Sequence, residues 1–118
     1  MAIRNVTQRN ALASAYATGA PFGALFTADP GTADAATGEV TGGAPAYNRK
    51  ALSWGAAAAS AVTGSAVFDV PSGTNVTYFG ACNTVTPGAA TVRDSVAIGP
   101  QNFSSQGTYT VTPTYTQA

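Results

Sequence analysis

At 118 residues the chain is long enough for one domain with its own hydrophobic core. Only 8% of the residues are charged, and five basic side chains balance five acidic ones, which excludes the clustered cations of a nucleic-acid-binding face or a polybasic membrane anchor. The chain has no histidine, and its single cysteine excludes an internal disulfide. We therefore expect synthesis in a reducing cytosol.

The apolar residues favour strands over helices. They make up 45% of the chain and include 25 alanines, but the large ones are mostly valines and aromatics, which suit a pleated sheet. Seventeen threonines dominate the polar residues. A nearly uncharged surface of this kind suits either a subunit packed in an assembly or a well-hydrated free domain, and composition alone leaves both open.

The N-terminal part predicts a helix, a strand and a long loop. Residues 5–18 form the helix, capped by Asn5 or Thr7 and ended by Gly19, and residues 1–20 form an N-terminal helical arm. A short apolar run at 22–27 predicts a strand. Residues 28–46 have no apolar period, so we expect this loop to be ordered by a partner and not by its own fold.

The middle of the chain predicts three or four more strands. In the first, at 47–54, Leu52 and Trp54 share one face, with Ala51 and Ser53 on the other. Residues 55–60 form a helical turn or a loop that leads into the next strand. A hairpin follows, with strands at 66–70 and 75–81 joined by a type II turn at 71–74.

Two strands are predicted near the C-terminus. After a loop at 84–90, a strand at 91–98 ends at Gly99 and Pro100. In the last strand, 108–116, threonines alternate with apolar residues, and Pro113 indicates a sheet edge or a break.

Six or seven short strands with frequent turns predict a mainly β fold. We expect a single-domain antiparallel β-sandwich over residues 1–118, Ig-like or jelly-roll-like, with a short N-terminal helix. The expected core residues are Trp54, Phe68, Val70 and Tyr109.

No catalytic, metal-binding or cofactor-binding set is evident in the sequence. Asp29, Asp34 and Glu39 are five residues apart, which does not match a calcium loop, and they are expected to be solvated. Nothing places Asp69 beside Asp94, and Cys82 lacks a histidine partner and is expected to be buried. We therefore expect that the protein is not an enzyme and that it binds no cofactor.

Several segments are distinctive as a set: MAIRN at 1–5 with TQR at 7–9, FTADPGT at 26–32, GGAPAY at 42–47 with RK at 49–50, FDVPSGT at 68–74 and QGTYTVTP at 106–113. In this order they resemble a family of small virion structural proteins of tailed phages that infect actinobacteria, whose members are described as minor tail, fibre or capsid decoration proteins. The resemblance covers nearly the whole chain. It implies a component of the virion, assembled in the host cytoplasm.

Three functions are compared: the resemblance implies the first two, and the third belongs to another class. The first is a capsid decoration protein on the capsid exterior, a homo-oligomer with a trimer favoured, whose partners are the major capsid protein and itself. The second is a minor tail or tail-fibre protein for host adsorption. The third, a small cell-wall hydrolase, lacks the catalytic residues that it needs. Neither nucleic acid nor membrane is expected as a partner.

The expected partner contacts lie in the N-terminal segment, the long loop and a small charged patch. They are Arg4, Arg9, Tyr16, Asp29, Asp34, Tyr47, Arg49 and Lys50. Arginine suits interfaces because its planar head binds carboxylates at two points. Residues 1–18 are either a principal contact or a cap on one end of the sandwich, and the sequence leaves both interpretations open.

Overall fold

The computed structural model describes residues 3–31, 38–86 and 91–118, and it shows an elongated molecule of 47 × 25 × 23 Å. The chain is mainly β with one N-terminal helix and antiparallel sheets, as predicted, and is compatible with a single-domain β-sandwich. Its elements are α1 (Val6–Gly19), β1 (Phe22–Phe26), β2 (Lys50–Ala51), β3 (Ala61–Thr63), β4 (Ala66–Val70), β5 (Thr74–Cys82), β6 (Val92–Phe103), β7 (Gly107–Val111) and β8 (Thr114–Thr116).

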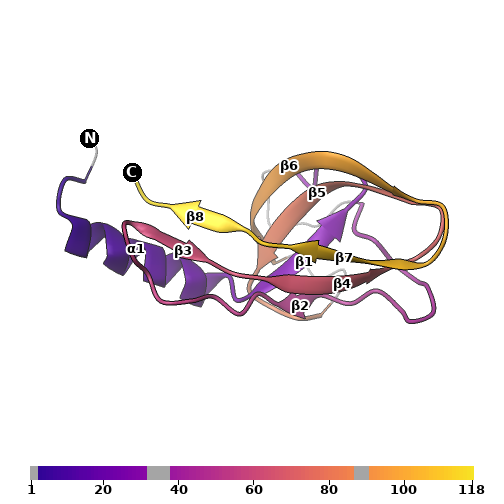
Figure 1. Ribbon diagram of the computed structural model, residues 1–118, viewed down its shortest axis with the longest axis horizontal. Helices are drawn as coiled ribbons and strands as arrows, with labels where there is room; N and C mark the ends of the chain where they lie inside the picture. Colours follow the sequence, from indigo (N-terminus) through magenta and orange to yellow (C-terminus); the bar gives the residue numbers. More distant parts are fainter. Residues whose placement is uncertain (1–2, 32–37, 87–90) are drawn as a thin grey trace.

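The strands form a four-stranded sheet and a long two-stranded ribbon (Figure 1). The sheet has the order β2-β1-β5-β6. In the ribbon, β3 pairs with β8 and β4 pairs with β7 in one continuous register, and the Gly64 amide donates to the Pro113 carbonyl at 3.0 Å where the two pairs join. The β4·β7 half packs with the sheet, and we call this part the sheet end. The β3·β8 half extends beyond it to α1, and we call these three elements the helical end.

The core lies between the four-stranded sheet and β4. Along β4 the side chains alternate, so that Phe68 and Val70 are fully buried and Val67 is 52% exposed. The prediction of these two as core residues is confirmed, whereas Trp54 and Tyr109 are only half-buried at its margin. A second cluster, which includes Phe26 and the free thiol of Cys82, accounts for the burial of β1 on both faces.

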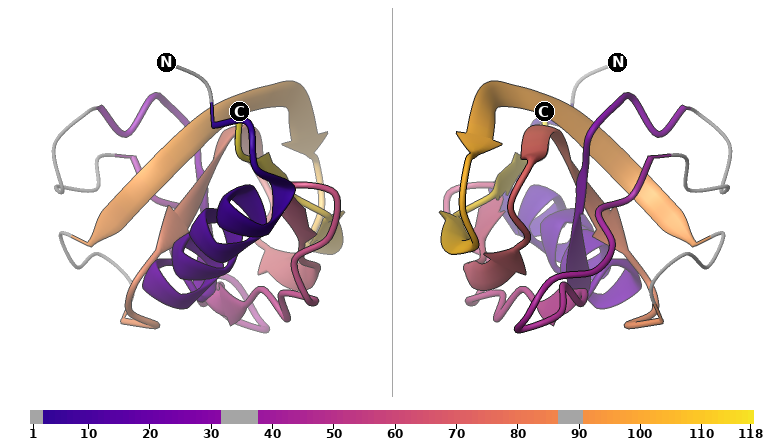
Figure 2. Two further views of the ribbon diagram at one scale, coloured as in Figure 1. Left: turned by 90° about the vertical axis from the view of Figure 1, so that its left-hand side faces the viewer. Right: turned by 90° about the vertical axis from the view of Figure 1, so that its right-hand side faces the viewer.

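Helix α1 closes the far end of the ribbon (Figure 2). Asn5 caps the helix as predicted, because its side chain accepts from the Gln8 amide at 3.1 Å. Ser60 fastens the helix to the loop before β3. Its hydroxyl accepts from Arg9 Nε and its amide donates to Asn10 Oδ1, both at 2.8 Å.

The predicted hairpin is wrong, although its two strands and its turn are present. Gly73 has φ +75°, as the third position of a type II turn requires. The turn nevertheless carries the chain from one layer to the other: β4 pairs with β7, and β5 pairs with β1 and β6. The pairing of β4 with β7, about 40 residues later in the chain, replaces the local pairing, and Phe68 and Val70 of β4 are buried in the core.

Strand β6 does not end at Gly99 and Pro100 but continues to Phe103. The proline is tolerated because β6 is an edge strand and its pairing with β5 is irregular there, moving from Val76↔Gln101 to Tyr78↔Ala97. The predicted strand at 47–54 is reduced to β2, although Leu52 and Trp54 still face inward. Residues 55–60 form the loop that was one of two expectations.

The long loop is ordered by the chain itself over residues 38–46, which corrects our expectation of a partner-ordered segment. The Val40 amide donates to the Leu25 carbonyl at 3.0 Å, and the Val40 side chain is buried. The side-chain amide of Gln106 donates from Nε2 to the Pro45 carbonyl at 3.2 Å. The part of the loop at 32–37 lies outside the described residues.

Candidate functional site

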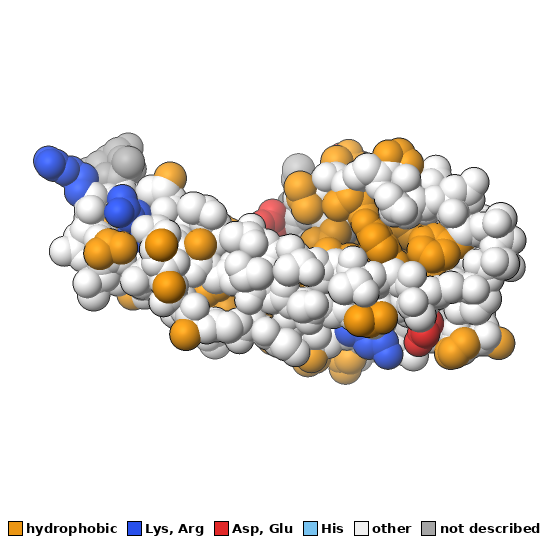
Figure 3. Space-filling model, in the orientation of Figure 1, with side chains coloured by type: hydrophobic (Ala, Val, Ile, Leu, Met, Phe, Trp, Pro, Cys, Tyr) orange, Lys and Arg blue, Asp and Glu red, His pale blue; other side chains and the backbone are white. Residues whose placement is uncertain are grey.

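A groove of about 320 Å³ lies where the helical end meets the sheet end. Residues from α1, β5, β6 and β8 line it, so it exists only because the ribbon carries β8 and α1 beside the sheet. We call it the aromatic groove, and its lining residues are Tyr16, Trp54, Phe79, Ala81, Asp94, Ser95, Val96, Pro113, Thr114 and Tyr115. Figure 3 shows the surface hollowed between the two ends, with an acidic side chain at the hollow.

Three aromatic side chains from distant parts of the sequence meet in the groove. The rings of Tyr16 and Tyr115 are stacked, with centroids 3.9 Å apart and planes at 8°. Trp54 meets Tyr16 edge to face at 6.0 Å, and its indole N–H donates to the Ala20 carbonyl at 2.9 Å. These contacts hold the helix, the ribbon and the loop before β3 in one arrangement.

Asp94 is the one charged side chain among the groove's lining residues, and it is exposed. Its Oδ2 accepts from the Tyr16 hydroxyl at 2.8 Å and its Oδ1 from the Ser95 amide at 2.9 Å. Burial, and then the hydrogen bond to Asp94, raises the pKa of Tyr16. The tyrosine therefore stays a neutral donor, and the carboxylate is fixed in position at the groove.

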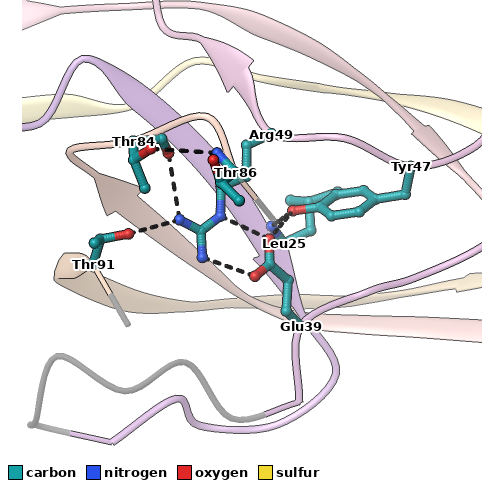
Figure 4. A network of polar contacts seen from close by, with 7 residues as sticks. All are labelled: Leu25, Glu39, Tyr47, Arg49, Thr84, Thr86 and Thr91. Carbon is teal, nitrogen blue, oxygen red and sulfur yellow. Dashed lines mark hydrogen bonds and ion pairs between the residues drawn. The ribbon is translucent and has the colours of Figure 1, made fainter. Parts of the chain in front are cut away.

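A second polar cluster lies inside the molecule (Figure 4). Arg49 donates from Nε to Glu39 Oε2 at 2.9 Å and from a terminal nitrogen to Glu39 Oε1 at 2.8 Å, and the two side chains are 0% and 4% exposed. The Tyr47 hydroxyl donates to Glu39 at 3.0 Å and accepts from the Leu25 amide at 2.9 Å. Arg49 also binds the Thr91 hydroxyl at 3.0 Å.

The charges of Arg49 and Glu39 form a buried ion pair, and this pair shifts the pKa values of the cluster. The hydrogen bonds to Glu39 raise the pKa of Arg49, and burial together with the Glu39 charge raises the pKa of Tyr47. The cluster joins the segment before β2 to β1 and to the loop before β6. It is enclosed, so its role is to hold loops in place.

The structure corrects the sequence-based expectations for three polar side chains. Arg49 and Tyr47 were expected at a partner contact, but they are 2% and 4% exposed. Glu39 was expected to be solvated, but it is the partner of Arg49. The reason is the same for all three: β1 ends beside residues 38–40, which brings Glu39 next to a cation ten residues later in the sequence.

The other expected contact residues are spread over the molecule. Arg4 is exposed before α1, whereas Arg9 is half-buried and donates to the Ile3 carbonyl and to Ser60. Asp29 is exposed and accepts from the Gly31 amide at 2.8 Å. Lys50 is half-buried in β2. Asp34 lies outside the described residues.

Among the expected contacts that the structure describes, Tyr16 alone lines the aromatic groove. The groove also contains three residues that were not predicted as site residues, namely Trp54, Asp94 and Tyr115. The alternation of 108–116 placed Tyr115 on the apolar face, which was a usable signal. No local pattern indicated that Asp94, 78 positions after Tyr16, would accept its hydroxyl.

Residues 3–31, 38–86 and 91–118 contain no group of three metal-ligating side chains and no helix long and apolar enough to cross a membrane. No family model, curated protein or solved structure matches the chain.

Proposed function

We propose that the chain is a structural component of a phage virion, a capsid decoration protein that binds the outer face of the major capsid shell. One observation carries the proposal: the outward face of α1 is uncharged. Val6–Gly19 contains a single charged residue, Arg9, and that side chain is directed to Ser60 and to the Ile3 carbonyl.

The outward face of α1 consists of small apolar and polar side chains. Its exposed residues are Val6, Thr7, Gln8, Ala11, Ser14, Ala15, Thr18 and Gly19. A helix on a free domain normally presents charged residues to solvent. A face without them can approach another protein closely at little desolvation cost, which supports a contact surface here.

The shape of the molecule supports attachment through the helical end. This end is one extremity of a molecule 47 Å long, so contact there leaves the sheet end away from the shell. Many copies on one particle would make a modest contact area sufficient, because each bound copy adds to the number of contacts between neighbouring capsomers. Self-association, with a trimer favoured, belongs to the same proposal.

The decisive variant places two charges on the outward face of α1. Ala11→Glu with Ala15→Glu is expected to abolish binding to shells of the major capsid protein in a sedimentation assay. The matched control, Thr110→Glu with Thr112→Glu, adds the same charge on the exposed face of the ribbon. Undiminished binding of the α1 variant, with circular dichroism equal to that of the unmodified protein, would refute the contact surface.

The copy number in purified virions tests the location. A decoration protein is expected at a number comparable with that of the major capsid protein, by densitometry of a stained gel. A handful of copies would refute decoration and would indicate the minor tail or tail-fibre role in host adsorption.

A further inference from the structure

We infer that the aromatic groove binds an arginine side chain of a partner protein, with Asp94 as the acceptor and the surrounding aromatic rings as the packing surface. The inference deepens the proposed function only in that it names the chemistry by which a protein partner is anchored. It rests on the groove and not on where the protein sits in a virion.

The hydrogen-bonding groups that line the groove are mostly occupied within the molecule. The Tyr16 hydroxyl is bound to Asp94 and the Trp54 indole N–H to the Ala20 carbonyl. The Tyr115 hydroxyl donates to the Gln117 side chain at 2.7 Å, and the Thr114 hydroxyl lies 2.9 Å from that of Thr63. A ligand that needs many donors and acceptors, such as a neutral sugar, finds few of them here.

Asp94 keeps acceptor capacity that the fold does not use. A carboxylate has about four lone-pair positions, and Asp94 accepts from two donors, Tyr16 and the Ser95 amide. Because these two bonds fix the orientation of the carboxylate, the remaining positions are held ready for an incoming donor. The preceding residue, Arg93, is not among the residues that line the groove. Among the described lining residues Asp94 therefore carries the one formal charge, and this negative charge is complementary to a cation.

The aromatic lining favours a guanidinium over an ammonium group. A guanidinium is planar, stacks on aromatic rings, is weakly hydrated and donates to a carboxylate at two points, whereas an ammonium group is compact and strongly hydrated. Tyrosine, tryptophan and arginine are also the side chains that most often dominate the energy of protein interfaces. The volume of about 320 Å³ is at the lower end of the range for ligand pockets, roughly 300–1,000 Å³, and suits a single side chain.

The test compares two small probes that differ in charge but hardly in shape. Nα-acetyl-arginine amide and Nα-acetyl-citrulline amide are titrated into the full-length protein, and the fluorescence of Trp54, the single tryptophan, reports occupancy. We expect saturable binding of the arginine probe at about millimolar concentration and at least tenfold weaker binding of the citrulline probe. The corresponding lysine probe is expected to bind more weakly than arginine.

A pair of variants assigns the effect to Asp94. Asp94→Asn keeps an acceptor for the Tyr16 hydroxyl and is expected to remove the preference for arginine over citrulline. Asp69→Asn, the same change on β4 outside the groove, is expected to leave it intact. The comparison of the two probes on the unmodified chain remains decisive if Asp94→Asn does not fold.

Three results would overturn the inference: equal affinity for the two probes, no saturable binding of the arginine probe, or a methyl glycoside that binds more tightly than arginine. The last result would assign the groove to a saccharide. None of these results depends on where the protein is located in a virion. If the protein prefers arginine but is absent from virions, the proposed function is refuted and the inference about the groove stands.

Discussion

The buried ion pair of Glu39 and Arg49 offers the sharpest test of how residues 38–46 are held against the rest of the chain. Glu39→Gln removes the negative charge while nearly preserving the shape of the side chain. Arg49 then remains buried without the carboxylate of Glu39, and breaking a buried pair in this way costs about 3–5 kcal/mol. That is a large share of the roughly 5–15 kcal/mol that stabilises a typical domain. The contact distances of 2.8 and 2.9 Å and the near-zero exposure of both side chains place this pair in that class.

The assay is urea denaturation followed by Trp54 fluorescence. With a denaturant slope of about 2 kcal/mol per molar urea, the expected loss lowers the midpoint by roughly 2 M. The double variant Glu39→Leu with Arg49→Met is expected to be more stable than Glu39→Gln, because it removes both charges of this pair. A loss below about 1 kcal/mol for Glu39→Gln would be typical of a solvated pair, and it would refute the enclosure of this segment.

Three further predictions concern the core, the ribbon and alkaline pH. Phe68→Ala is expected to cost about 3–5 kcal/mol, and Val67→Ala, on the exposed face of the same strand, under about 0.5 kcal/mol in the same urea assay. In Gly64→Ala the new Cβ would lie 2.5 Å from the Leu52 carbonyl oxygen. We therefore expect the free energy of unfolding to fall by about 1–3 kcal/mol in thermal or urea unfolding. Gly99→Ala is expected to be tolerated, because its Cβ would meet nothing within 4 Å. Burial raises the pKa of the Cys82 thiol from 9.0 to about 11, so the unfolded chain loses this proton first and stability falls as the pH rises from about 9 to 11. Replacing Cys82 by alanine is expected to reduce that slope, and an unchanged slope would contradict the assignment.

Local signals in the sequence were sufficient for the elements that depend on neighbouring residues. The cap at Asn5 predicted the start of α1, and the alternation of threonines with Tyr109 and Tyr115 predicted both faces of the last strands. The break expected at Pro113 is present between β7 and β8. In each case the determining contact lies within a few residues, so periodicity and capping rules were enough.

Features that depend on distant residues were missed. The turn at 71–74 predicted a hairpin, but the partner of β4 is decided by β7, about 40 residues later in the chain. Arg49 beside Lys50 has the pattern of a surface charge pair, and only the folded chain brings Glu39 to it. The aromatic groove joins Tyr16, Trp54 and Tyr115, whose separations follow no period.

The continuous register of the ribbon determines where foreign sequence can be carried. Residues 3 and 118 both lie at the helical end, whereas the turn at Ser72 and Gly73 lies at the opposite extremity, where β4 leaves the ribbon. Both turn residues are exposed, and a Cβ at Gly73 would meet no atom within 4 Å, although its φ of +75° means that the glycine itself should be kept. A peptide inserted beside Ser72 would therefore project from the tip farthest from the termini. On a particle bound through the helical end, this turn is the natural position for displaying an epitope or a fluorescent tag.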